Sequence, residues 1–316
     1  MNTGTEQKKH ALGVPPIDIM TSLQIKPEPL DFVLPGLLAG TVGVVVSPGG
    51  TGKSWLMLES CFSVGIGEDV ADIWGKQPTM GRVVYLVAED PQEVLERRVH
   101  GMGHLLRVQG EDERAARNVE IIPAYGQGFR IADMSPLGIV ASPQWNELTA
   151  HLLANPARLL VLDTYNRLLG GISENDSGAM GAVLSIIEQT CRKTGCAAVL
   201  VHHTNKNSMS TGTGSEQSAA RGSSAITDNA RWQANLSTMS KEEGEARNIA
   251  SDEDRRRWVR LDLAKVNYGP PIAERWLHKG LSGELSHGEP PRKVGKANKA
   301  SRTSRKEDYD VDQIPY

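Results

Sequence analysis

The chain has 316 residues, of which 39% are hydrophobic and 23% charged, and its formal net charge at pH 7 is −3. This composition fits one large or two modest globular domains and gives no global charge bias toward nucleic acid or a membrane. The sequence has no apolar run of the roughly 20 residues that a membrane span needs, and its first ten residues are not followed by the apolar region expected of a signal peptide. Its three cysteines lack C-x-x-C spacing, so we expect reduced thiols in a cytoplasmic protein.

Residues 1–29 are polar and contain prolines, which predicts a flexible N-terminal arm. Between residues 30 and 287, short runs rich in Val, Ile and Leu alternate with amphipathic stretches. Such runs are typical of strands buried on both faces of a parallel sheet. They lie at Thr41–Val46, Arg82–Ala88, Val119–Ile122, Leu159–Asp163 and Ala197–His202.

The stretches between these runs have helical spacing. Apolar residues recur from Met180 to Cys191 at helical intervals, and Gly195 then stops the helix. Another helix is expected to begin at Pro91, with Asp90 as its N-cap. The alternation predicts an α/β fold with a mostly parallel central sheet flanked by helices.

The last third of the chain differs in pattern. A strand is expected at Ala230–Ser237, and the alternating side chains of Trp258–Lys265 favour a half-exposed edge strand. Residues 288–316 are predicted to form a disordered basic tail, since Arg292–Lys306 holds seven Lys and Arg and no acid. That run is either solvated disorder or an arm that touches nucleic acid.

The first run leads into S-P-G-G-T-G-K-S, a glycine-rich loop that ends in Lys-Ser. Such a loop binds the phosphates of a nucleoside triphosphate, because its glycines allow positive φ angles that turn backbone N–H groups toward the anion. Ser47 stands where the usual pattern has its first glycine. The loop predicts ATP and Mg²⁺ as cofactors, bound by Gly49, Gly50, Thr51, Gly52, Lys53 and Ser54.

Lys53 would contact the β- and γ-phosphates, and the Ser54 hydroxyl would bind Mg²⁺. Two further strands are each expected to end near a carboxylate of the same site. Asp163 ends an apolar strand, as the second metal-binding residue of such a site does. Glu89 follows another strand and is the candidate base for the attacking water, because ligands of open α/β sheets lie at the carboxyl ends of strands.

The strand at Ala197–His202 ends in two adjacent histidines. Neighbouring strand residues point to opposite faces, so His202 and His203 cannot share one metal. Either histidine can be purely structural. Of the two, His203 is the better candidate for a side chain that senses the γ-phosphate by a hydrogen bond.

Six blocks of sequence, in order and spread over residues 30–276, resemble the RepA-type hexameric replicative DNA helicases of broad-host-range plasmids, which are RecA-fold motors. The first three would suit any RecA-fold ATPase, whereas the last two are specific to this family. The blocks are Leu30–Ser54, Val83–Pro91, Leu159–Arg167, Val201–Lys206, Ala219–Gln233 and Lys265–Trp276.

The resemblance implies further roles and partners. Arg231, in D-N-A-R-W, would be an arginine finger that reaches a neighbouring subunit's ATP, and Lys265 resembles the trans-acting lysine of RecA-like interfaces. An ion pair of Arg231 with Asp228 is the structural alternative. The implied partners are single-stranded DNA and further copies of the chain in a homohexameric ring. A primase or an origin-binding initiator is left open.

Two loops are candidates for DNA contact. Thr204–Ser224 is rich in Ser, Thr, Asn and Gly and holds Lys206 and Arg221, and such a long loop inside a domain is usually functional or disordered. The second loop is Asn166–Ser177, which follows the strand that ends in Asp163 and holds Arg167. We therefore expect an ATP-dependent replicative helicase. The alternatives are a RecA-fold recombination-type ATPase, or a nucleotide-switched DNA-binding regulatory or scaffold protein.

Overall fold

The computed structural model describes residues 16–203, 224–249 and 251–292, and within these ranges its centre is a nine-stranded sheet. The strand order is β13-β12-β11-β10-β3-β9-β8-β4-β5. The strands from β10 to β5 are parallel, and β11, β12 and β13 add antiparallel neighbours. Their bounds are β3 Val42–Ser47, β4 Val83–Val87, β5 Val119–Pro123, β8 Leu159–Asp163, β9 Ala197–His203, β10 Trp232–Thr238, β11 Trp258–Val266, β12 Arg275–Lys279 and β13 Leu285–His287.

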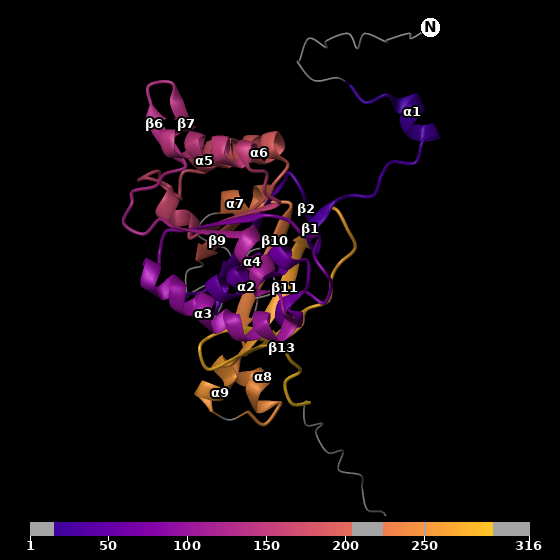
Figure 1. Cartoon of the computed structure of the whole chain (residues 1–316), viewed down its shortest axis with the longest axis vertical. Coiled ribbons are helices and arrows are strands. Elements are labelled where there is room, and N and C mark those ends of the chain that lie inside the picture. The colour runs from indigo at the N-terminus through magenta and orange to yellow at the C-terminus, as the bar shows by residue number, and fades with distance from the viewer. Residues whose placement is uncertain (1–15, 204–223, 250, 293–316) are drawn as a thin grey trace, which may run out of the picture.

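Helices cover both faces of this sheet (Figure 1). One face packs against α2 Lys53–Ile66, α3 Gln92–Gln109 and α4 Asp112–Asn118. The other packs against α5 Pro143–Ala154, α6 Ser177–Thr194 and α7 Ser224–Asn229. The predicted α/β class, a mostly parallel sheet flanked by helices, is confirmed.

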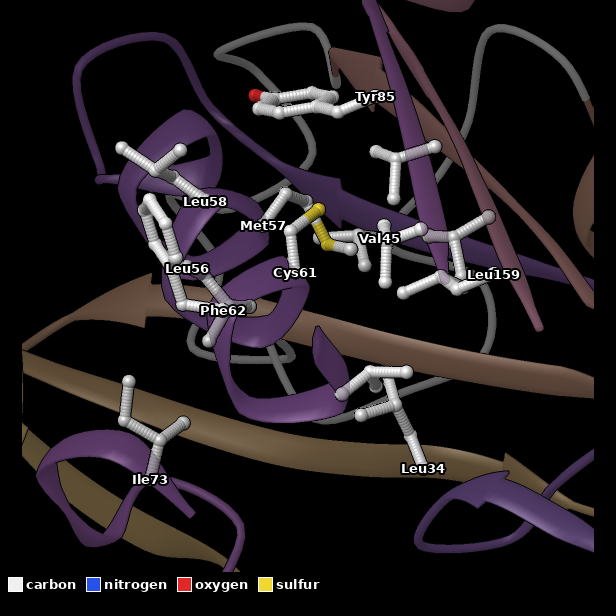
Figure 2. Packing of buried hydrophobic residues seen from close by; sticks show 14 of the residues in the cluster. Leu34, Val45, Leu56, Met57, Leu58, Cys61, Phe62, Ile73, Tyr85 and Leu159 are labelled. Atoms are coloured by element: carbon white, nitrogen blue, oxygen red, sulfur yellow. The ribbon is translucent and has the colours of Figure 1, made fainter. Parts of the chain in front are cut away.

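Successive strand residues divide between the two cores. On β4, Tyr85 lies in the core beneath α2 and Leu86 in the core beneath α5 and α6. Figure 2 shows the first core, where Cys61 of α2 lies beside Val45 of β3 and Leu159 of β8 is in the same layer. Because both faces are covered, each central strand is apolar up to its carboxyl end, which explains the continuous runs in the sequence.

The five predicted parallel strands agree with the structure to within a residue or two, and Gly195 caps α6 in the left-handed conformation with φ 76°. Two expectations were wrong. Trp258–Val266 is not an edge strand, because β12 and β13 pair beyond it. The helix after Pro91 begins at Gln92, and the Asp90 carboxylate accepts a hydrogen bond from the Arg98 guanidinium at 2.6 Å instead of capping it.

Smaller elements surround the sheet. They are α1 Ile19–Gln24, β1 Phe32–Leu34, β2 Leu37–Leu38, β6 Ala132–Ser135, β7 Gly138–Ala141, α8 Lys241–Glu245 and α9 Asp252–Arg256. Helix α1 stands apart from the sheet and its helices (Figure 1). Within the described ranges, no helix combines the length and the apolar character that crossing a membrane requires. Residues 1–15 and 293–316 lie outside the described residues, so the arm and the tail stay predictions.

Candidate active site

Four neighbouring parallel strands, β3, β9, β8 and β4, end at the same edge of the sheet. The register pairs Ser47 of β3 with His203 of β9, and Val87 of β4 with Asp163 of β8. Each strand, or the turn after it, carries one of the predicted site residues at this edge. In strand order they are Lys53, His203, Asp163 and Glu89.

The glycine-rich loop forms an open turn between β3 and α2. Gly50 and Gly52 have φ angles of 77° and 118°, which favour glycine. Gly49 does not have a positive φ angle, so two of the three loop glycines use the freedom that glycine allows. A Cβ atom at Gly49 or Gly50 would meet nothing within 4 Å. Since α2 begins at Lys53, its free N–H groups lie at this turn, where an anion is stabilised.

Lys53 folds back onto its own loop. Its Nζ atom donates to the carbonyl oxygens of Ser47 at 3.0 Å and Pro48 at 2.9 Å, and lies 3.2 Å from Ser47 Oγ. Ser47 is fully buried, and its hydroxyl gives Lys53 a contact that a glycine at this position would lack. Burial lowers the pKa of Lys53 to about 8, against the opposing effect of Asp163 and Glu89.

His203 connects Lys53 with Glu89. Its Nδ1 atom lies 3.0 Å from Lys53 Nζ, and its Nε2 atom lies 3.2 Å from Glu89 Oε2. A charged lysine has only donors, so Nδ1 accepts, and the ring proton belongs on Nε2, where it donates to the carboxylate. The side chains of His203 and Glu89 are 35% and 40% exposed, which leaves this chain of contacts open to a ligand.

Asp163 is buried beside Ser54. Tyr85 donates its hydroxyl to Asp163 Oδ2 at 2.6 Å, and burial raises the pKa of Asp163 although the side chains of Tyr85 and Ser54 favour the carboxylate. Asp163 Oδ1 is buried without a hydrogen-bond partner among the described residues. A carboxylate and a hydroxyl next to a phosphate loop are what Mg²⁺ uses in nucleotide sites, so the residues present fit this ion. The contact of Tyr85 with Asp163 was not predicted from the sequence.

The second histidine faces away from the loop. His202 is buried, and its Nδ1 atom lies 3.0 Å from Asn166 Oδ1. Burial, followed by the charges of His203 and Lys53, lowers the pKa of His202 to about 4. The next residue after Asn166, Arg167, is exposed. Lys206 and Arg221 lie outside the described residues.

Arg231 and Lys265 lie at the opposite edge of the sheet, where the parallel strands β3 and β10 begin. Arg231 directly precedes β10, whose Trp232 pairs with Gly43 near the start of β3. Lys265 Nζ donates to the carbonyl oxygen of Asp228 at 2.9 Å and to that of Thr227 at 3.1 Å. Burial and, second, the positive charge of Arg231 lower the pKa of Lys265, and the nearby charge of Asp228 opposes this shift.

Neither cation forms an ion pair with an acid in the part of the chain that the structure describes. The alternative of a pair between Arg231 and Asp228 is therefore not found. Strand β3 spans six residues, so at about 3.3 Å per residue its two ends are roughly 16 Å apart. Arg231 is exposed at the end opposite to Lys53.

The chain matches a known protein family over more than half of its length. The AAA domain family matches residues 10–209, more than half of the chain. The match includes the phosphate loop, Glu89, Asp163 and His203, whereas Arg231 and Lys265 lie beyond it. The chain therefore belongs to the AAA domain family of P-loop ATPases.

Proposed function

We propose that this ATPase is a replicative DNA helicase of the plasmid type that works as a homohexameric ring with ATP at its subunit interfaces. One observation carries the proposal. The phosphate loop lies at one edge of the parallel sheet, and two cations without acidic ion-pair partners in the described chain lie at the opposite edge. In a ring of head-to-tail subunits, one edge of each subunit meets the other edge of its neighbour.

Within one subunit, each residue has a separate part in hydrolysis. Lys53 leaves the loop carbonyls to contact the β- and γ-phosphates. Glu89 orients the attacking water and accepts its proton. Ser54 and Asp163 hold Mg²⁺, which neutralises charge on the phosphates when it is bound.

His203 is suited to sense the γ-phosphate because it touches both partners of the reaction. Lys53 Nζ is 3.0 Å from one ring nitrogen, and Glu89 Oε2 is 3.2 Å from the other. When Lys53 turns to a phosphate, it no longer donates to the ring, so His203 is free to reorient. The state of the nucleotide then changes the position of Glu89.

The neighbouring subunit completes the site. Arg231 is placed against the transferring phosphoryl group, where a guanidinium stabilises the negative charge that spreads in the transition state. Lys265 supports the same interface. Contacts with single-stranded DNA are assigned to Lys206 and Arg221, and to the exposed Arg167.

Two assays test the helicase assignment. ATP hydrolysis is measured with and without single-stranded DNA, and a forked duplex with a labelled strand is then offered with ATP. We expect DNA to stimulate hydrolysis and the fork to be unwound. Stimulation without unwinding would favour a recombination-type ATPase, and slow hydrolysis indifferent to DNA would favour a nucleotide-switched regulatory protein.

A further inference from the structure

A second lysine touches the phosphate loop from a distant part of the sequence. Lys279, the last residue of β12, donates from Nζ to the carbonyl oxygen of Gly50 at 2.9 Å. Gly50 lies in the loop whose N–H groups cradle phosphates. The loop is therefore approached by two ammonium groups, from Lys53 within it and from Lys279 on the strand hairpin β12–β13.

The hairpin is fixed against the loop by other contacts. The backbone N–H of Leu285, on β13, donates to the buried carboxylate of Glu59 at 2.6 Å. The two methyl groups of Leu285 lie 3.5 and 3.6 Å from the position that a Cβ atom at Gly52 would take. Lys279 thus reaches the loop from a rigidly packed hairpin, so its ammonium group is held there in advance of any ligand.

The charge of Lys279 is not balanced by an acid. No carboxylate forms an ion pair with it among the described residues, and burial lowers its pKa with no nearby acid to oppose this effect. Lys53 differs, since Asp163 and Glu89 oppose the effect of its burial. A half-buried cation without a counter-ion, next to N–H groups that bind an anion, is suited to a phosphate ligand.

We infer that Lys279 is a nucleotide-binding residue of its own subunit, which turns from Gly50 to the α- and β-phosphates when the loop holds a nucleotide. The inference rests on the proposed ATPase function and adds a phosphate ligand from the same chain. It also gives the hairpin a contact that changes with the occupancy of the loop.

Calorimetric binding of ADP to the full chain tests the inference without hydrolysis. Lys279→Met should weaken ADP binding about 10- to 100-fold, the effect of losing a hydrogen bond to a charged group. Lys279→Gln keeps a donor for Gly50 without the charge, and should weaken ADP binding similarly. Lys279→Arg should bind like the wild type. Lys76→Met, a change at an exposed lysine, is the matched control and should have no effect.

Wild-type affinity in Lys279→Gln would overturn the inference, because the hydrogen bond to Gly50 would then be the only role of this residue. So would equally weak binding by Lys279→Arg and Lys279→Met. Far-ultraviolet circular dichroism shows whether each variant is folded, and the glutamine variant serves if the methionine variant is not. Absence of ADP binding in the wild type would overturn the ATPase function itself, and this inference with it.

Discussion

The two edges of the parallel sheet, at the carboxyl and the amino ends of its strands, differ in what their charged side chains contact. At the carboxyl edge, Lys53, His203 and Glu89 form one chain of contacts. At the amino edge, Arg231 and Lys265 are cations that form no ion pair with an acid in the described part of the chain. The first group links three side chains within a single chain, whereas Lys265 donates to two backbone carbonyl oxygens and Arg231 is exposed. This difference is the basis of our proposal that the second group serves another copy of the chain.

The largest expected effect concerns Arg231. Arg231→Ala should lower the rate of ATP hydrolysis by ~10³–10⁵-fold, since the transition-state charge loses its stabilising guanidinium. ADP affinity should stay unchanged, because Arg231 lies at the edge opposite to the loop of its own subunit. Single-turnover hydrolysis and calorimetry measure the two quantities. A normal rate of hydrolysis in Arg231→Ala would show that Arg231 does not act in the reaction.

A smaller loss is expected at the carboxyl edge. Glu89→Gln should retain ATP binding and lower hydrolysis by ~10²–10⁴-fold, the range for a lost general base. Glu93→Gln, a change at an exposed glutamate of α3, is the matched control and should hydrolyse ATP at the normal rate. Near-normal turnover in Glu89→Gln would end the assignment of Glu89 as the base.

The pH dependence of stability tests how tightly the carboxyl edge is packed. Burial lowers the pKa of His202 from 6.5 to about 4, so between these values the unfolded chain binds a proton that the folded chain does not. The free energy of unfolding should therefore fall as the pH drops from about 6.5 to 4, by up to about 3 kcal/mol.

Urea unfolding of the wild type and of His202→Asn, at several pH values in this window, measures the effect. The variant lacks the titrating ring, so its stability should change less with pH. The ratio of its hydrolysis rate to that of the wild type should stay constant over the window, because His202 faces away from Lys53. Parallel stability curves would show that His202 is not buried as the structure has it.

The smallest expected effect concerns a third region, the loop Thr204–Ser224 that is predicted to contact DNA. Lys206→Ala combined with Arg221→Ala should reduce DNA-stimulated hydrolysis several-fold and leave the basal rate intact, because DNA contact and ATP chemistry use different residues. Deletion of residues 292–306 serves as the comparison. If that deletion abolishes DNA binding while the double variant binds normally, contact with DNA belongs to the tail.

Much of the carboxyl edge could be predicted from the sequence. The central strands are apolar up to their carboxyl ends because helices cover both faces, and residues at or shortly after those ends lie where ligands bind. This reasoning brings Lys53, Glu89, Asp163 and His203 together without knowledge of the strand order. The order then explains their contacts, since β9 lies between β3 and β8.

Other features have no local signal in the sequence. Tyr85 belongs to an apolar strand, and only the structure gives its hydroxyl a carboxylate partner on β8. Lys279 is 229 residues from Gly50, and its short strand mixes charged and apolar residues. Strands β12 and β13 were not predicted because their residues show the same mixture, and Trp258–Lys265 was therefore expected at the edge of the sheet. These contacts and strand pairings depend on the tertiary structure and are not visible in the local sequence pattern.

The most direct test of the account mixes two inactive variants. Lys53→Ala lacks the lysine of the phosphate loop and keeps Arg231, whereas Arg231→Ala keeps Lys53. A mixed assembly contains interfaces with an intact Lys53 on one side and an intact Arg231 on the other. We predict that ATP hydrolysis recovers when the two variants are mixed. No recovery, in mixed assemblies shown to form by native mass spectrometry, would contradict the claim that Arg231 acts on a neighbour's ATP.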